Sequence, residues 1–270
     1  MDRIRANYPL AAAVARASMG VPRHAPLVIR LEYRPAGEIR QQLFVAGKGV
    51  AFDTGGVNVK AASSAGMSRD KCGAAAAAGL VRAFAALRAP DVRVVAMLGV
   101  VVNAVGPEAY LPDEIVRGHS GRRVLVTHTD AEGRMVLADM LSSLREEAVA
   151  SVADPALKHA SITMCSIATL TGHVGLAWGP YTAAMENGPA AAHGLARALQ
   201  HAGTLLADPL EVSSLRREDF AVVAAHTPDH DVVQSVVHLP RPVKRGHQYP
   251  AAFLLRASAL DVHGTRAELP

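Results

Sequence analysis

Acidic side chains are concentrated at one turn near the middle of the chain. Residues 124–141 (VLVTHTDAEGRMVLADML) begin as an apolar run, turn at 127–130 and continue with the apolar spacing of a helix. Asp130 and Glu132 lie at this junction, where two carboxylates are well placed to hold hard or borderline cations. Arg134 and the free N–H groups of the first helical turn would form an anion site beside them. A cation site next to an anion site indicates hydrolysis at a metal.

A second segment is expected to complete this site. Residues 45–79 contain Lys48, Asp53, Lys60 and Asp70, separated by glycines that allow backbone and ligand to approach closely. We expect the two aspartates to converge with the two acids of the central turn. Four carboxylates are enough for two divalent ions that share a bridging oxygen.

The surrounding sequence predicts the elements that would position these residues. Short apolar runs predict strands at 27–33, 42–47, 92–102 and 161–170. Helices are predicted at 1–24, 70–87, 189–202, 215–220 and 250–260, and loops at 106–121 and 229–247. The alternation of buried strands and helices predicts an α/β class with a mainly parallel or mixed central sheet flanked by helices.

Three motifs in these segments resemble those of the M17 family of leucyl aminopeptidases, also called cytosol aminopeptidases. They read GKGVAFDTGGVNVK at 47–60, MSRDKCGAA at 67–75 and HTDAEGRMVLAD at 128–139. Their order and approximate spacing also match the family. The resemblance implies the catalytic domain of a two-metal peptidase, holding Zn²⁺ or Mn²⁺, or else Mg²⁺.

The resemblance also assigns roles to individual residues. It implies metal ligands at Lys48, Asp53, Asp70, Asp130 and Glu132, with Asp53 and Glu132 shared between the two ions. Lys48 would ligate as a neutral amine, which burial beside two divalent ions favours.

Catalysis and substrate binding are assigned in the same way. Lys60 would polarise the scissile carbonyl, and Arg134 would hold a bicarbonate-like anion that serves as general base. The first side chain of the substrate would lie against Met67, Thr169, Leu170 and Gly172.

Each of these residues also has a simpler interpretation. Asp130 and Glu132 can be a helix N-cap and a first-turn acid. Lys48 in a glycine-rich stretch resembles a phosphate binder, although the motif of a P-loop is incomplete. Lys60 and Arg134 can be ordinary surface cations, and Met67 can be core.

In domain terms, the resemblance implies a linker helix at 1–24 and a catalytic domain at 25–270. The family's N-terminal domain and its closing C-terminal strand and helix are expected to be absent. Within the motifs, His128 stands where the family usually has Asn, and Lys71 stands where it often has an apolar residue.

The predicted function is release of N-terminal residues from peptides, with a preference for apolar residues such as leucine. The family resemblance implies a homo-oligomer, a hexamer. The alternative is a catalytically weak or inactive M17-like subunit with a structural or assembly role.

The amino-acid composition argues against some other classes of protein function. The net charge is +4, but the arginines are scattered and aromatic residues make up 4% of the 270, so nucleic-acid binding is not favoured. Two cysteines, Cys72 and Cys165, give no disulfide framework and are expected to be buried in a reducing, cytoplasmic protein.

No membrane-spanning run is predicted. A zinc site in the histidine-rich segment is a minor alternative, with candidate ligands His226, His230, Asp231 and His238.

Overall fold

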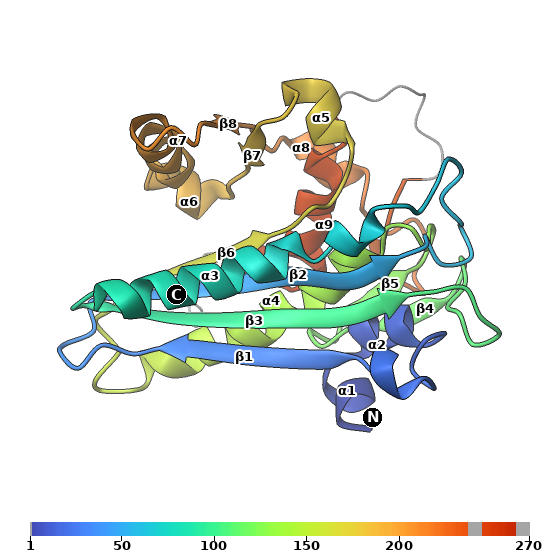
Figure 1. Cartoon of the computed structure of the whole chain (residues 1–270), viewed down its shortest axis with the longest axis horizontal. Helices are drawn as coiled ribbons and strands as arrows, with labels where there is room; N and C mark the ends of the chain where they lie inside the picture. Colours follow the sequence, from blue (N-terminus) through green and yellow to red (C-terminus); the bar gives the residue numbers. More distant parts are fainter. Residues whose placement is uncertain (1, 237–244, 263–270) are drawn as a thin grey trace.

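A mixed four-stranded sheet forms the centre of the chain (Figure 1). The computed structural model describes residues 2–236 and 245–262. The strand order is β1 (Leu27–Tyr33), β3 (Val92–Asn103), β2 (Gln41–Asp53) and β6 (Ser161–Ile167). β1 runs antiparallel to β3, whereas β2 is parallel to both β3 and β6. The predicted α/β class with a mixed sheet is confirmed.

The two central strands are buried on both faces. Helix α3 (Cys72–Leu87) covers one face, and helix α4 (Glu132–Val152) covers the other (Figure 1). Side chains of β2 and β3 alternate between the two cores, with Phe44, Ala46, Val95 and Met97 on the α4 side and Val45, Val94 and Ala96 on the α3 side. This double burial explains why both strands are apolar runs in the sequence.

The N-terminal segment is not the single helix that the sequence predicts. It forms α1 (Asp2–Asn7) and α2 (Pro9–Ala15), with a break at Tyr8. Pro9 lacks a backbone N–H and occupies the first position of α2, where no such bond is needed. All of α2 after Pro9 is buried, and it packs on α4.

A small second sheet contains strands in regions predicted as loops. It has the order β4 (Ile115–Arg117), β5 (Arg123–Leu125), β9 (Val232–Val233), so the loop predictions are wrong at β4 and β9. These strands are only two or three residues long, too short to give a periodic pattern. Helix α9 (Gln248–Ala257) contacts β9, and α8 (Arg217–Ala221) contacts α9; both helices overlap the predicted ones at 250–260 and 215–220.

The segment after β6 extends away from the main sheet (Figure 1). It contains α5 (His173–Trp178), β7 (Thr182–Ala184), α6 (Gly188–Ala192), α7 (Leu195–Leu205) and β8 (Leu210–Val212). The single helix predicted at 189–202 is two helices, separated at His193 and Gly194, where Gly194 has a positive φ of 65°. Within residues 2–236 and 245–262, the structure has no helix with the length and apolarity needed to cross a bilayer.

Candidate metal centre

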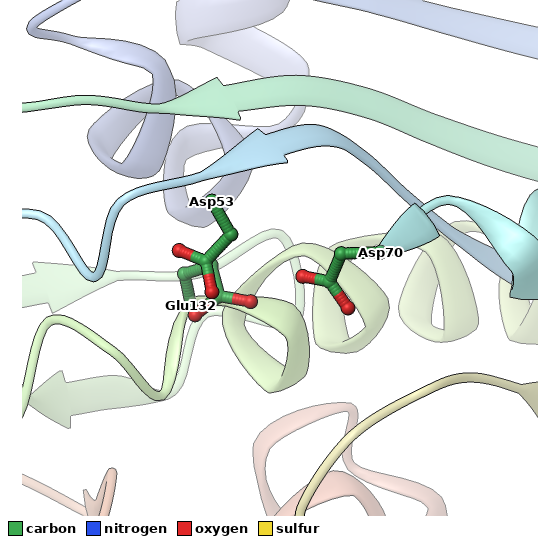
Figure 2. Close-up of side chains that lie close together, drawn as sticks. All are labelled: Asp53, Asp70 and Glu132. Atoms are coloured by element: carbon green, nitrogen blue, oxygen red, sulfur yellow. The ribbon is translucent and has the colours of Figure 1, made fainter. Parts of the chain in front are cut away.

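Three predicted metal ligands meet where β2 ends and α4 begins. Asp53 is the last residue of β2, Glu132 is the first residue of α4, and Asp70 follows the short helix η2 (Met67–Arg69). Their carboxylates turn toward one another in Figure 2, and one ligand oxygen from each lies within 4.8 Å of the others. All three side chains are buried. Residues from three separate parts of the sequence therefore form one acidic cluster.

Lys48 lies between two of these acids. Its Nζ is 2.8 Å from Asp70 Oδ1 and 2.9 Å from Glu132 Oε1, and only 3% of the residue is exposed. Burial alone lowers the pKa of Lys48, but the two carboxylates outweigh burial and raise this pKa above its ordinary value. In the absence of another cation, Lys48 is therefore an ammonium.

Gly133 makes room for this lysine. A Cβ built on Gly133 would lie 2.4 Å from Lys48 Cε and 2.7 Å from its Nζ. The first turn of α4 can therefore approach the Lys48 side chain this closely only because residue 133 has no side chain.

Lys60 also lies between two carboxylates, those of Asp53 and Asp130. Its Nζ is 2.6 Å from Asp53 Oδ2 and also contacts Asp130 Oδ1. Burial lowers the pKa of Lys60, but both carboxylates raise it, and the net pKa lies above the ordinary value. Asp130 is therefore joined to the cluster through Lys60, and it lies just before α4 as predicted.

The cluster has the composition of a divalent-cation site. Two ammonium groups face four carboxylates, which leaves an excess of negative charge. Asp70 Oδ2 and Glu132 Oε2 are buried without a hydrogen-bond partner among residues 2–236 and 245–262. Burial, moderated by Lys48, raises the pKa of Glu132 to about 7. Unpaired carboxylate oxygens in a buried acidic cluster are suitable ligands for divalent cations, so these residues fit the metals that the motifs imply.

Two buried residues that the sequence analysis did not identify support this cluster. Asn103 Nδ2 donates to Asp53 Oδ1 at 2.8 Å and to the Thr129 carbonyl at 3.1 Å. Tyr110 Oη donates to the same carbonyl at 2.6 Å. Burial, followed by the nearby acids, raises the pKa of Tyr110 well above its ordinary value, so the phenol keeps its proton. The position of Asn103 at the carboxyl end of a buried strand was the available sequence signal.

The loop after β2 is tied to the turn before α4. Thr129 N donates to Asn58 Oδ1 at 2.8 Å, and Thr129 Oγ1 donates to the Gly55 carbonyl at 2.7 Å. Gly55 has a φ of 93°, and a Cβ there would lie 2.4 Å from the Asn58 carbonyl oxygen. This explains why the first motif needs glycine at this position.

His128 and Gln234 shape the same turn. His128 Nδ1 accepts a hydrogen bond of 3.2 Å from the Asp130 N–H, a bond that an Asn side chain commonly makes two residues along the chain. The His128 side chain can therefore substitute for the family's Asn in this local bond. Gln234 Oε1 accepts from the N–H groups of Thr127 and His128 at 2.9 and 3.0 Å.

Arg134 is buried on the first turn of α4. Its Nη1 donates to the Gln234 carbonyl at 2.9 Å, and its Nε has no partner within the part of the chain that the structure describes. Burial lowers the pKa of Arg134 to about 10. A buried cation with an unused N–H donor suits an anion, so the predicted bicarbonate site remains compatible with the geometry. The surface interpretation of Arg134 is wrong, because only 8% of the residue is exposed.

The predicted substrate-binding residues lie at different distances from the cluster. Thr169 contacts it directly, because its carbonyl accepts from Lys48 Nζ at 2.8 Å and its Oγ1 donates to Asp70 Oδ1 at 2.8 Å. The Met67 carbonyl accepts from the Asp70 N–H at 3.2 Å, and the Met67 side chain is half-buried. Leu170 packs against the main core, and Gly172 is exposed.

The alternative zinc site does not assemble in the part of the chain that the structure describes. His230 is buried and bonded to its neighbours Asp229 and Thr227, and Asp231 is paired with Arg123. His238 lies outside the described residues. One cysteine expectation is also wrong, because Cys72 is exposed at the start of α3.

Comparison with known proteins identifies the class. Residues 2–268 match the model of the cytosol aminopeptidase family, catalytic domain. The chain is 41% identical, over 98% of its length, to a Caenorhabditis elegans protein with the provisional name of aminopeptidase. It is 34% identical, over 74% of its length, to an Aquifex aeolicus protein named probable cytosol aminopeptidase.

The chain therefore belongs to the cytosol aminopeptidase family, M17, a metal-dependent family of peptide hydrolases. It spans 49% of the Caenorhabditis protein and 38% of the Aquifex protein.

Proposed function

We propose that this chain forms the catalytic core of a metal-dependent aminopeptidase that removes apolar N-terminal residues, such as leucine, from peptides. The observation that carries the proposal is the pair of lysines, Lys48 and Lys60, each held between two carboxylates at the end of β2. A purely structural role does not require one buried and one half-buried ammonium group among four acids, because such groups are costly to desolvate.

Two divalent ions, Zn²⁺ or Mn²⁺ or else Mg²⁺, would be held by the acids of this cluster. Asp130, Glu132 and Asp53 would hold one ion, and Lys48, Asp53, Asp70 and Glu132 the other. When bound, such ions lower the pKa of water and polarise the scissile carbonyl. The unpaired oxygens Asp70 Oδ2 and Glu132 Oε2 support this assignment.

Lys60 and Arg134 would supply the remaining chemistry. Lys60 stays protonated at neutral pH because Asp53 and Asp130 raise its pKa. Its ammonium can therefore donate a hydrogen bond to the carbonyl oxygen as negative charge develops there. Arg134, together with the N-terminus of α4, would hold a bicarbonate-like anion that accepts a proton from the attacking water.

Substrate position follows from the residues around Asp70. Met67, Thr169, Leu170 and Gly172 would line the pocket for the first side chain of the peptide. Thr169 supports this role because its hydroxyl bonds Asp70 and its carbonyl bonds Lys48. Exposed Gly172 leaves open space beside it, since a Cβ there would meet nothing within 4 Å.

The wider organisation is proposed from the family. We propose a cytoplasmic homo-hexamer in which residues 1–24 form the linker segment and residues 25–270 form the catalytic domain.

The test is hydrolysis of leucine p-nitroanilide by the purified chain with Mn²⁺ or Zn²⁺, with and without bicarbonate. Lys60→Ala and Asp130→Ala should each lower kcat at least about 100-fold, in line with the loss of one electrostatic catalytic group. Lys158→Ala, at an exposed lysine beyond α4, is the matched control and should keep wild-type activity. No turnover by a folded, metal-loaded sample would favour the alternative of a structural or assembly subunit.

A further inference from the structure

We propose that Asn103 is a positioning residue that fixes the Asp53 carboxylate and joins it to the turn that carries Asp130. The inference rests on the proposed metal site, but it concerns a residue outside the three motifs. Asn103 is the last residue of β3, beside the end of β2, and it is fully buried.

The two oxygens of Asp53 have different surroundings. Oδ1 accepts from the Gly55 N–H at 2.9 Å and from Asn103 Nδ2 at 2.8 Å. Oδ2 faces Lys60 at 2.6 Å. Two donors therefore hold Oδ1, and Oδ2 is the oxygen that faces the Lys60 ammonium. Without Asn103, the Gly55 N–H would be the one remaining donor to Oδ1 among the described residues.

The second N–H of the amide reaches the other loop. It donates to the carbonyl of Thr129, the residue that precedes Asp130, at 3.1 Å. One side chain on a central strand thereby connects two predicted ligands that are 77 positions apart in the sequence. Partners behind the ligands of a metal site commonly set ligand orientation in this way.

The amide orientation of Asn103 is determined by its neighbours. Both Asp53 Oδ1 and the Thr129 carbonyl are acceptors, so the nitrogen must face them. The amide oxygen then remains buried, with no hydrogen-bond partner among the described residues. An unpaired buried acceptor is unfavourable for stability. A role in positioning the acidic cluster would explain why an amide side chain is nevertheless found at residue 103.

Three variants and one control test the proposal. Asn103→Leu keeps approximately the side-chain volume and removes both donors, and Asn103→Ser retains one short donor. Tyr110→Phe removes the other bond to the Thr129 carbonyl and leaves the Asp53 contact intact. The control is Gln42→Ala, because Gln42 is equally buried on β2 but bonds Ser151 and Arg93 at the opposite end of the strand.

The readouts are Mn²⁺ affinity by calorimetry, the visible absorption spectrum of the Co²⁺-loaded protein, and the thermal unfolding midpoint. Asn103→Leu should weaken Mn²⁺ binding by about 10–100-fold and change the Co²⁺ spectrum. Asn103→Ser should lie between this variant and the wild type. Tyr110→Phe and Gln42→Ala should lower the midpoint but keep the wild-type spectrum.

The outcomes separate this inference from the proposed function. Wild-type protein that binds no Mn²⁺ would refute the proposed metal site itself. Wild-type protein that binds Mn²⁺, with Asn103→Leu showing equal affinity and an unchanged Co²⁺ spectrum, would overturn only the role of Asn103. If neither Asn103 variant folds even with Mn²⁺, Asn103 is required for the fold, and the positioning role is likewise rejected.

Discussion

Replacing Gly133 with alanine should disrupt the candidate metal centre, although alanine is the better helix former. The new Cβ would lie 2.4 Å from Lys48 Cε, whereas carbon atoms in contact are normally about 3.5–4.0 Å apart. Lys48 must therefore move by about 1 Å. Its Nζ holds two carboxylates and the Thr169 carbonyl at 2.8–2.9 Å, so this movement strains all three contacts.

The magnitude follows from two opposing effects. Overpacking of a buried site costs about 1–3 kcal/mol. Alanine gains at most about 1 kcal/mol over glycine in a helix, and less in a first turn, where Gly133 lies. The free energy of unfolding should therefore fall by about 0.5–3 kcal/mol, which lowers the unfolding midpoint by about 1–10 °C. Mn²⁺ affinity should fall as well.

Gly79→Ala is the matched control. Gly79 lies inside α3, is exposed, and a Cβ there would meet nothing within 4 Å. This substitution should raise stability by about 0.5–1 kcal/mol and leave Mn²⁺ affinity unchanged. Urea unfolding and calorimetry on both variants make the comparison. Gly133→Ala with wild-type stability and Mn²⁺ affinity would show that Lys48 is not confined as the structure describes.

Three further outcomes are expected. His128→Asn should retain the bond to the Asp130 N–H and stay within about 0.5 kcal/mol of wild type, whereas His128→Leu should lose about 1 kcal/mol in urea unfolding; equal losses would contradict the turn geometry. Burial raises the pKa of Asp139 to about 7, against about 3.9 when unfolded, so its stabilising contribution is complete below pH 4 and is lost as pH rises through 7. Asp139→Asn should therefore flatten the decline in unfolding free energy between about pH 4 and pH 7, and an unchanged slope would refute this reasoning. Finally, Mn²⁺ binding at pH 7 should release protons, because Glu132 has a pKa of about 7 and Lys48 is protonated. The measurement is calorimetry in two buffers with different ionisation enthalpies. Equal binding heats in the two buffers would show that no protons are released.

The sequence predicted the strands of the main sheet because each contains a short apolar run bounded by turn residues. β1 was predicted with its observed ends, and β2 begins one residue before its predicted start and extends six residues beyond its predicted end. The glycines in the first motif obscured that extension. The antiparallel direction of β1 and the pairing of β5 with β9 depend on contacts between distant segments, which a local pattern does not contain.

The charged residues of the candidate site were predictable because each lies in a motif with several unusual residues. The structure also identifies supporting residues that lie outside the motifs. Asn103 and Tyr110 lie outside all three motifs, and their importance comes from a shared contact with the Thr129 carbonyl. Hydrogen bonds of this kind join residues through space, so their spacing along the chain gives no signal.

The two lysines have a consequence for how the protein matures. Each ammonium lies between carboxylates that would otherwise repel one another. The chain thus supplies its own counter-ions, and the acidic residues can come together during folding before any metal is available. At the proposed site, metal uptake would be an exchange at a preformed cluster, with loss of the Lys48 proton, and would not need to be coupled to folding as it is in zinc fingers.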